Sequence, residues 1–166
     1  MWTPLLVVLF STVIFASDVI VHCGDSHSSR PTSAASKCSN GWRSFNNGCY
    51  RLFYTPKPWA HAADFCALQG GHLTSVSDER EDDFIKNLVV STGQQLSHWI
   101  GGFTTVHSAD LLWADGAQWK YSSLHETNTT NSPKRCALVN VVLSMSIEWY
   151  MDHCDSEWPF ICKKMA

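Results

Sequence analysis

The sequence predicts an α+β fold in which two helices are segregated from short antiparallel strands. Two segments before residue 90 have apolar residues at helical spacing. After Asn87 the chain becomes aromatic and breaks into short segments typical of strands. Seven cysteines indicate covalent cross-links between these elements, and the 166 residues fit a single domain.

The first helix is predicted at residues 59–71, WAHAADFCALQGG, where the closing glycines can end it. The second is predicted at residues 77–89, SDEREDDFIKNLV. Asp78 followed by Glu81 resembles a capping box, and the early acids suit the positive end of the helix dipole. We interpret the acidic run at residues 78–83 as a solvated helix start rather than a binding tract. Short strands are predicted at residues 42–53, 99–102, 118–121, 136–142, 147–150 and 159–163.

The first residues, MWTPLLVVLFSTVIFAS, are apolar over about a dozen positions, which is too few to span a bilayer. They predict a signal peptide at residues 1–16, with cleavage as late as residue 23 as the second choice. The alternative is an uncleaved membrane anchor, which the lack of a following basic flank disfavours. Residues 24–37 are Ser-rich and predict a flexible leader, and the patterned domain occupies residues 38–164. We therefore expect a secreted, extracellular protein without membrane insertion.

Charge and motif content exclude several classes of function. The formal net charge is −3 and no basic patch is present, which argues against nucleic acid as a partner. The eight histidines are scattered and form no HExxH pair, and no Gly-x-Ser-x-Gly elbow occurs. We predict that the protein is not an enzyme and that it uses no cofactor.

The seven cysteines predict a disulfide framework formed in an oxidising compartment. Six of them can pair within the domain, and counting alone leaves fifteen connectivities open. The seventh, Cys23, lies in the polar leader. It predicts an interchain disulfide and a disulfide-linked homodimer, unless signal cleavage removes it.

Five stretches closely resemble the C-type lectin-like domain: CSNGWRSFNNGCYRLF, WAHAADFCALQGGHLTSVSDEREDDFI, HWIGG, WADGAQWKY and EWPFICK. The match runs from Cys38 to Lys163. The resemblance implies two helices and two small antiparallel sheets, with a long loop region at one end. It implies core positions for Trp99, Trp113, Trp119 and Trp149, and it implies the disulfides Cys38–Cys49, Cys66–Cys162 and Cys136–Cys154.

Members of this family that bind sugar through calcium share a set of oxygen ligands. They use a Glu-Pro-Asn or Gln-Pro-Asp triplet in the long loop, a glutamate two residues before a cysteine, and an Asn-Asp pair after a tryptophan. Calcium wants six to eight oxygens, several of them charged. At least three of these ligands are missing here, so we predict no metal site. The corresponding positions are Glu126-Thr127-Asn128, Lys134, Tyr150 and Met151.

The sequence is similar to secreted fish mucus and plasma lectins of this family, some of which bind β-galactosides without calcium. Tyr150 would stack on the apolar face of a galactose-type sugar, while loop amides, carboxylates and cations would bond its hydroxyls. Asn128-Thr129-Thr130 is also a candidate N-glycosylation sequon. The candidate sugar-binding residues are His125, Glu126, Asn128, Lys134, Arg135, Tyr150 and His153.

The function predicted from these features is a lectin that cross-links microbial or cell-surface glycans in innate defence. A dimer through Cys23 would raise the avidity of a weak sugar site. Two alternatives of the same fold remain open. One is a calcium-free module that binds a protein partner, and the other is an ice-binding protein, for which only Thr127, Thr129 and Thr130 give a hint.

Overall fold

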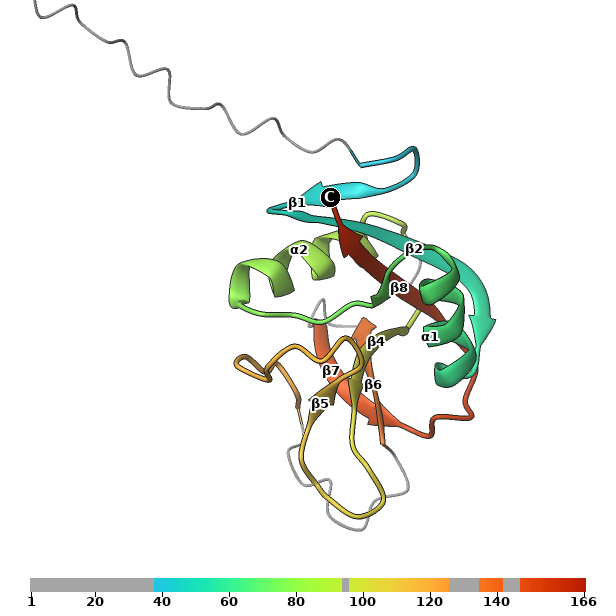
Figure 1. The fold of residues 1–166 in the computed structure, drawn as a ribbon, viewed down its shortest axis with the longest axis vertical. Coiled ribbons are helices and arrows are strands. Elements are labelled where there is room, and N and C mark those ends of the chain that lie inside the picture. Colours follow the sequence, from blue (N-terminus) through green and yellow to red (C-terminus); the bar gives the residue numbers. More distant parts are fainter. Residues whose placement is uncertain (1–37, 94–95, 126–134, 142–146) are drawn as a thin grey trace, which may run out of the picture. The chain divides into compact units, whose positions relative to one another are not determined.

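The computed structural model describes residues 38–93, 96–125, 135–141 and 147–166 (Figure 1). The predicted signal peptide at residues 1–16, the leader at residues 24–37 and Cys23 lie outside the described residues. Within them, no helix is long and apolar enough to cross a membrane. In chain order the elements are β1 (Arg43–Phe45), β2 (Gly48–Lys57), α1 (Trp59–Leu68), β3 (His72–Leu73), α2 (Glu79–Val90), β4 (His98–Phe103), β5 (Leu112–Trp113), β6 (Cys136–Val141), β7 (Ile147–Asp152) and β8 (Trp158–Met165).

The strands of the described chain form one sheet in the order β1-β2-β8-β4-β6-β7, with β3 beside β8 and β5 beside β4. Two antiparallel groups, one around β2 and β8 and one around β4 and β6, correspond to the two predicted sheets. A parallel contact between Trp99 of β4 and Phe160 of β8 joins them into a mixed sheet. The predicted α+β class is confirmed, and the two sheets are continuous.

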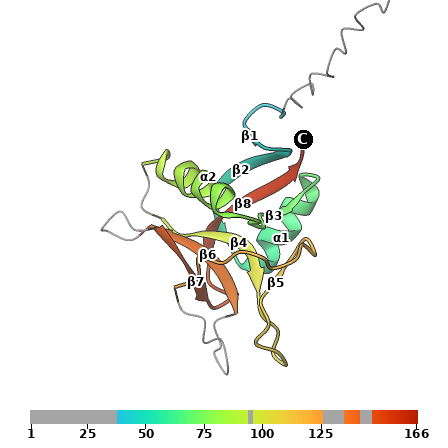
Figure 2. The same ribbon diagram turned by 90° about the vertical axis from the view of Figure 1, so that its left-hand side faces the viewer.

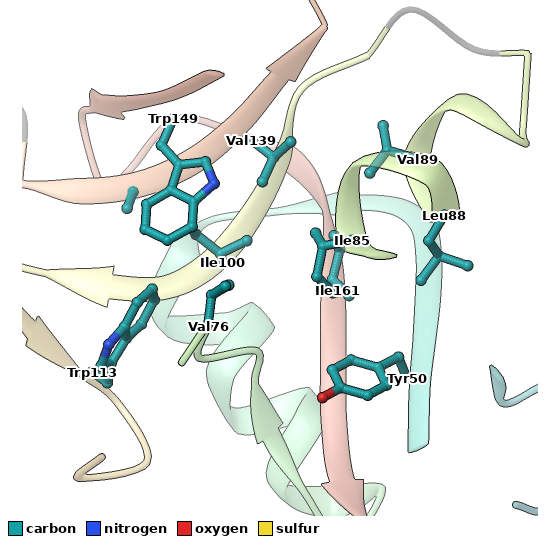
Figure 3. Close-up of a cluster of buried hydrophobic side chains, with 11 residues drawn as sticks. Tyr50, Val76, Ile85, Leu88, Val89, Ile100, Trp113, Val139, Trp149 and Ile161 are labelled. Atoms are coloured by element: carbon teal, nitrogen blue, oxygen red, sulfur yellow. The ribbon is translucent and has the colours of Figure 1, made fainter. Parts of the chain in front are cut away.

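Both faces of β8 are buried over its central residues, because the two helices cover opposite sides of this strand. Successive strand residues point to opposite faces. Ile161 accordingly packs in one cluster with Ile85 and Val89 of α2 (Figure 3). Phe160 packs in a second cluster beneath α1, where its ring lies 5.4 Å from that of Phe65. Figure 2 shows β8 passing between the two helices.

Three disulfides fasten the domain. Cys66–Cys162 joins α1 to β8, Cys136–Cys154 joins the start of β6 to the turn after β7, and Cys38–Cys49 closes the β1–β2 hairpin. These are the three pairs that the resemblance implies. Each is expected to stabilise the fold by roughly 2–4 kcal/mol, mainly by restricting the unfolded chain.

The predicted core tryptophans are found in the interior. Trp99 and Trp149 have no exposed surface and Trp113 is 3% exposed. Trp119 is partly buried and stacks on Trp113 with ring centroids 4.1 Å apart. The strand predicted at residues 118–121 is wrong, because this segment is held by the packing of the Trp119 ring and not by a backbone ladder.

Helix α2 begins as the sequence predicts. The Asp78 side chain caps it by accepting a 2.9 Å hydrogen bond from the Glu81 amide. The second half of a capping box is missing. The Glu81 carboxylate instead accepts from the amide of Ser77 at 2.9 Å and from its hydroxyl at 2.6 Å.

The prediction that residues 78–83 are a solvated acidic run is wrong for two of them. Glu81 is 3% exposed and Asp82 is 1% exposed. Glu81 accepts hydrogen bonds from Tyr50 and from Lys163, whose ammonium lies 2.6 Å away. Burial alone would raise the pKa of Glu81, but these hydrogen bonds hold it below its ordinary value.

Asp82 connects three parts of the chain through one buried carboxylate. It accepts from Lys86 on its own helix at 2.8 Å, from the Tyr121 hydroxyl at 2.8 Å and from the Trp149 indole at 2.9 Å. A buried N–H or O–H left without an acceptor costs about 1–3 kcal/mol. The Asp82 carboxylate therefore removes the desolvation penalty of several donors at once.

We predict that Asp82→Ala lowers the free energy of unfolding by about 2–4 kcal/mol, because it removes the acceptor of the buried Trp149 indole and of the Tyr121 hydroxyl. It also removes the charge partner of the partly buried Lys86. Asp83→Ala is the matched control. Asp83 is the next residue on the helix and is exposed, so its loss should change stability by about 0.5 kcal/mol or less. Urea unfolding followed by tryptophan fluorescence measures both variants, and equal effects would contradict the assigned role of Asp82.

His98 is a second buried polar group. Its Nδ1 lies 2.8 Å from the Leu96 carbonyl, and its Nε2 is buried without a hydrogen-bond partner in the described chain. Burial disfavours the imidazolium and lowers the pKa of His98 from 6.5 to about 4, although the Leu96 carbonyl opposes this shift. The folded protein therefore keeps this imidazole neutral in mildly acidic solution.

This shift predicts a pH-dependent stability. Between pH 6.5 and about 4, His98 binds a proton in the unfolded chain but stays unprotonated in the folded chain. The free energy of unfolding should thus fall as the pH falls through this window, by up to about 1.4 kcal/mol per pH unit, with no further loss from His98 below it. His98→Gln should remove this contribution while leaving the carboxylate titrations in place. Unfolding curves at several pH values test it, and identical slopes for the two proteins would refute it.

Candidate functional site

The candidate site is built on β7, whose successive residues point to opposite faces of the sheet. Trp149 points into the core, where its indole meets Asp82. Glu148, Tyr150 and Asp152 follow the opposite phase of the alternation and share the other face of the strand. The strand thus uses a buried tryptophan to present two carboxylates and a phenol.

His125 reaches the same strand through backbone pairing. Leu124 forms a parallel bridge with Trp149, the amide of His125 donates to the Trp149 carbonyl at 2.9 Å, and the amide of Trp149 donates to the Ser123 carbonyl at 3.1 Å. These bonds fix residues 123–125 along the outer edge of β7. The imidazole of His125 is consequently placed beside Tyr150.

One carboxylate oxygen organises the cluster. The Oε2 of Glu148 lies 2.7 Å from Nδ1 of His125 and accepts from the Tyr150 hydroxyl at 3.0 Å. The imidazole and phenol rings lie 5.2 Å apart and are tilted by 31°. The His125 side chain is 52% exposed and that of Glu148 is 33% exposed. The result is a solvent-accessible aromatic pair with a carboxylate between its polar atoms.

Two other predicted residues lie at the far end of β7. The Arg135 carbonyl accepts from Thr104, and its amide donates to the Asp152 carbonyl at 3.0 Å. His153 is exposed and begins a turn closed by the Ser156 amide. Within the described chain, neither side chain forms a hydrogen bond or ion pair with His125. The structure thus brings His125 and Tyr150 together and places Arg135 and His153 at the other end of the strand.

The remaining predicted residues cannot be located. Glu126, Asn128 and Lys134 lie outside the described residues. The Asn128 sequon and the threonines at 127, 129 and 130 lie outside them as well. The ice-binding alternative rests on those threonines and receives no support from the described part of the chain.

Glu148 is the site residue that the sequence analysis missed. Its signal was available, because residues two apart on a strand share a face, and Glu148 is two residues before Tyr150. The contact with His125 carried no comparable signal. It depends on pairing between segments more than twenty positions apart.

The described residues do not fit a calcium ion of the kind that the family resemblance implies. The positions of the Asn-Asp ligand pair hold Tyr150, whose hydroxyl bonds Glu148, and Met151, which packs against the core. Among residues with described positions, no three histidine, cysteine, aspartate or glutamate side chains are grouped so that they could hold a metal. A phenol and a thioether are poor ligands for a hard cation. No role is therefore derived for calcium.

Comparison with known proteins places this geometry in a family. Residues 55–164 match the model of the Lectin C-type domain. A lectin from Pleurodeles waltl is 28% identical over 136 residues, which cover 80% of this chain and 79% of the relative. One polypeptide of a snaclec from Echis carinatus, named as a coagulation factor IX/factor X-binding protein, is 31% identical over 131 residues, which cover 78% of this chain and 98% of the relative.

A solved structure has the same fold. Human lithostathine superposes with a TM-score of 0.73 at 22% sequence identity, covering 80% of this chain and 94% of that chain. At this level of identity the similarity supports the architecture alone. It agrees with the arrangement of helices, sheet and disulfides described above.

Proposed function

Because the chain belongs to the C-type lectin domain family, we propose that it is a secreted lectin that binds β-galactoside-type glycans without calcium. The family comprises carbohydrate-binding domains rather than enzymes. The curated relatives include a protein named as a lectin. The specificity and the independence from calcium are proposed from this chain's own residues.

The observation that carries the proposal is the aromatic pair on β7. Galactose has an apolar face that stacks on an aromatic ring, and its hydroxyls need donors and acceptors at the rim. Tyr150 is half-buried and its hydroxyl is bonded to Glu148, so the ring is held in one orientation. The exposed His125 imidazole and the Glu148 carboxylate supply polar atoms next to it.

Calcium independence is proposed because the polar atoms of this cluster satisfy one another. In calcium-dependent members of the family, the sugar hydroxyls bind the metal and its ligands. Here the imidazole and the phenol both bond directly to the same oxygen of the Glu148 carboxylate, which is therefore already engaged. Glu126, Asn128, Lys134 and Arg135 remain candidate contacts to the hydroxyls of the sugar.

Secretion and covalent dimerisation complete the proposal. Disulfides form and persist in oxidising compartments, and the three in the domain agree with the signal peptide predicted at residues 1–16. Cys23, if it remains after cleavage, would link two chains. Two linked sites would cross-link glycans on microbial or cell surfaces, and avidity would raise binding by about 10²-fold or more. We propose this as a role in innate defence, in mucus or plasma.

We predict that the secreted protein is retained on lactose-agarose in the presence of EDTA, is eluted by free lactose and is not retained on mannose-agarose. Tyr150→Ala should weaken lactose binding by about tenfold or more, because it removes the stacking ring. Tyr150→Phe keeps the ring and should retain most of the binding.

Tyr54→Ala is the control, since Tyr54 is a 50% exposed tyrosine on β2, away from the cluster. It should leave retention unchanged. Retention that disappears in EDTA would refute calcium independence. Failure to bind either sugar would refute the lectin assignment and favour a protein-binding module.

The covalent dimer is tested separately on gels. The secreted protein should migrate as a dimer without reductant and as a monomer with it. Cys23→Ser should give a monomer in both lanes while keeping its retention on lactose. A monomer band for the unaltered protein in both lanes would end the proposal of an interchain disulfide.

A further inference from the structure

The strand β2 has an open edge. It pairs with β8 from Gly48 to Phe53 and again at Lys57, with a register shift between Phe53 and Lys57, but β1 covers only Gly48–Tyr50 on its other side. Beyond Tyr50, no strand in the described chain pairs with this side of β2, which continues past the short β1 (Figure 1). An edge of this kind presents unpaired backbone N–H and C=O groups to any extended chain that reaches it.

A groove of about 680 Å³ runs along this open edge. It is lined by residues 41–43, by residues 50–54 of β2 and, on one side, by Leu88, Ser91 and Thr92 at the end of α2. The strand β2, with the exposed ring of Tyr54, and the end of the helix form its walls. Its volume falls within the range of ordinary ligand sites in proteins.

The groove is cationic on a protein whose net charge is negative. Arg43 and Arg51 are its only charged lining residues, and neither forms an ion pair within the described chain. At its rim, the ammonium of Lys164 lies 4.2 Å from the ring centroid of Trp42. The Arg51 guanidinium lies 5.0 Å from the centroid of Phe53. These cations are positioned by aromatic rings and not by acids, so their charge is available to a ligand.

The two arginines flank the open edge from opposite faces of the sheet. Arg43 lies directly opposite Tyr50, and opposed residues point to the same face. Arg51 follows Tyr50, so it points to the other face. A chain lying along the edge would therefore meet a guanidinium on each side.

We propose that this groove binds an extended acidic peptide segment of a partner protein, which adds a strand to the open edge of β2. The backbone of residues 51–55 supplies the ladder, which is regular to Phe53 and irregular beyond it, and Pro56, which has no N–H, ends it. Arg43 and Arg51 bond acidic side chains on the two faces of the added strand. A second copy of this chain is disfavoured as the occupant, because pairing two identical edges would bring the arginines together.

The test uses a fluorescein-labelled eight-residue peptide in which pairs of glutamates alternate with pairs of valines. This order puts acids on both faces of an extended strand. Fluorescence anisotropy with the full mature chain should detect binding that weakens with salt. The same peptide with lysine in place of glutamate should not bind, and N-methylation of alternate residues should weaken binding by about tenfold or more because it blocks the ladder.

Two variants of equal charge change supply the control. R43E/R51E should weaken binding of the acidic peptide by about tenfold or more. R80E/K120E changes exposed cations outside the groove and should have little effect. If the double variant does not fold, R43E alone tests the proposal, because Arg43 is exposed and its replacement should not disturb the fold. Retention of R43E/R51E on lactose would verify that its fold and the β7 cluster are intact.

Amide hydrogen exchange measures directly whether the backbone of the β2 edge is bonded by the peptide. Bound peptide should slow the exchange of β2 amides between residues 51 and 55. The proposal is overturned if the lysine peptide binds equally well, or if R43E and R43E/R51E both bind like the unaltered protein. It is also overturned if the N-methylated peptide binds as tightly as its parent, which would make the groove a general polyanion surface.

Discussion

The buried carboxylate of Asp82 is the contact on which the rest of the site depends. It fixes α2 against Trp149 in β7 and against Tyr121, where the segment leading to His125 begins. Burial and the bond to Asp82 raise the pKa of Tyr121 to about 12, so its hydroxyl stays a donor at neutral pH. The orientation of Trp149 sets the alternation of β7 and therefore the outward face of Tyr150. A contact in the core thus determines what the surface presents.

Local signals in the sequence predict most helices and strands, whereas contacts between residues far apart in the sequence cannot be predicted from it. Asp78 was recognisable as a helix cap because its partner lies three residues away. Glu81 and Asp82 look like solvated acids in their local context, yet their partners Lys163 and Trp149 lie far along the chain. The two-residue strands β3 and β5 are too short to show any period. Elements defined by their neighbours in sequence were predictable, and burial defined by distant partners was not.

The residues of the candidate site also divide into those that the sequence could identify and those that depend on a distant contact. Tyr150 could be selected because the family resemblance assigns a ligand to its position, and Glu148 could have been selected from the alternation of a strand. The sequence indicates only that His125 is a loop residue. Its contact with Glu148 arises because Leu124 pairs with Trp149. Glu126, Asn128 and Lys134 lie outside the described residues. The part of the site that rests on β7 is therefore its best-defined part.

The two proposed surfaces occur at opposite ends of the strand order, and they differ because the two edges differ. At β7, residues 123–125 pair with Trp149, so the edge beside the cluster is occupied, and the proposed binding uses the side chains of Glu148, Tyr150 and His125. At β2, the neighbouring strand β1 begins at Arg43 opposite Tyr50, so the backbone of β2 beyond Tyr50 remains available. A covered edge favours a compact ligand such as a sugar, which bonds side chains and stacks on a ring. An open edge flanked by cations favours an extended acidic chain, which can use the backbone ladder and the charges together. The two proposals therefore place chemically different partners on different strands of one sheet, where they would not compete.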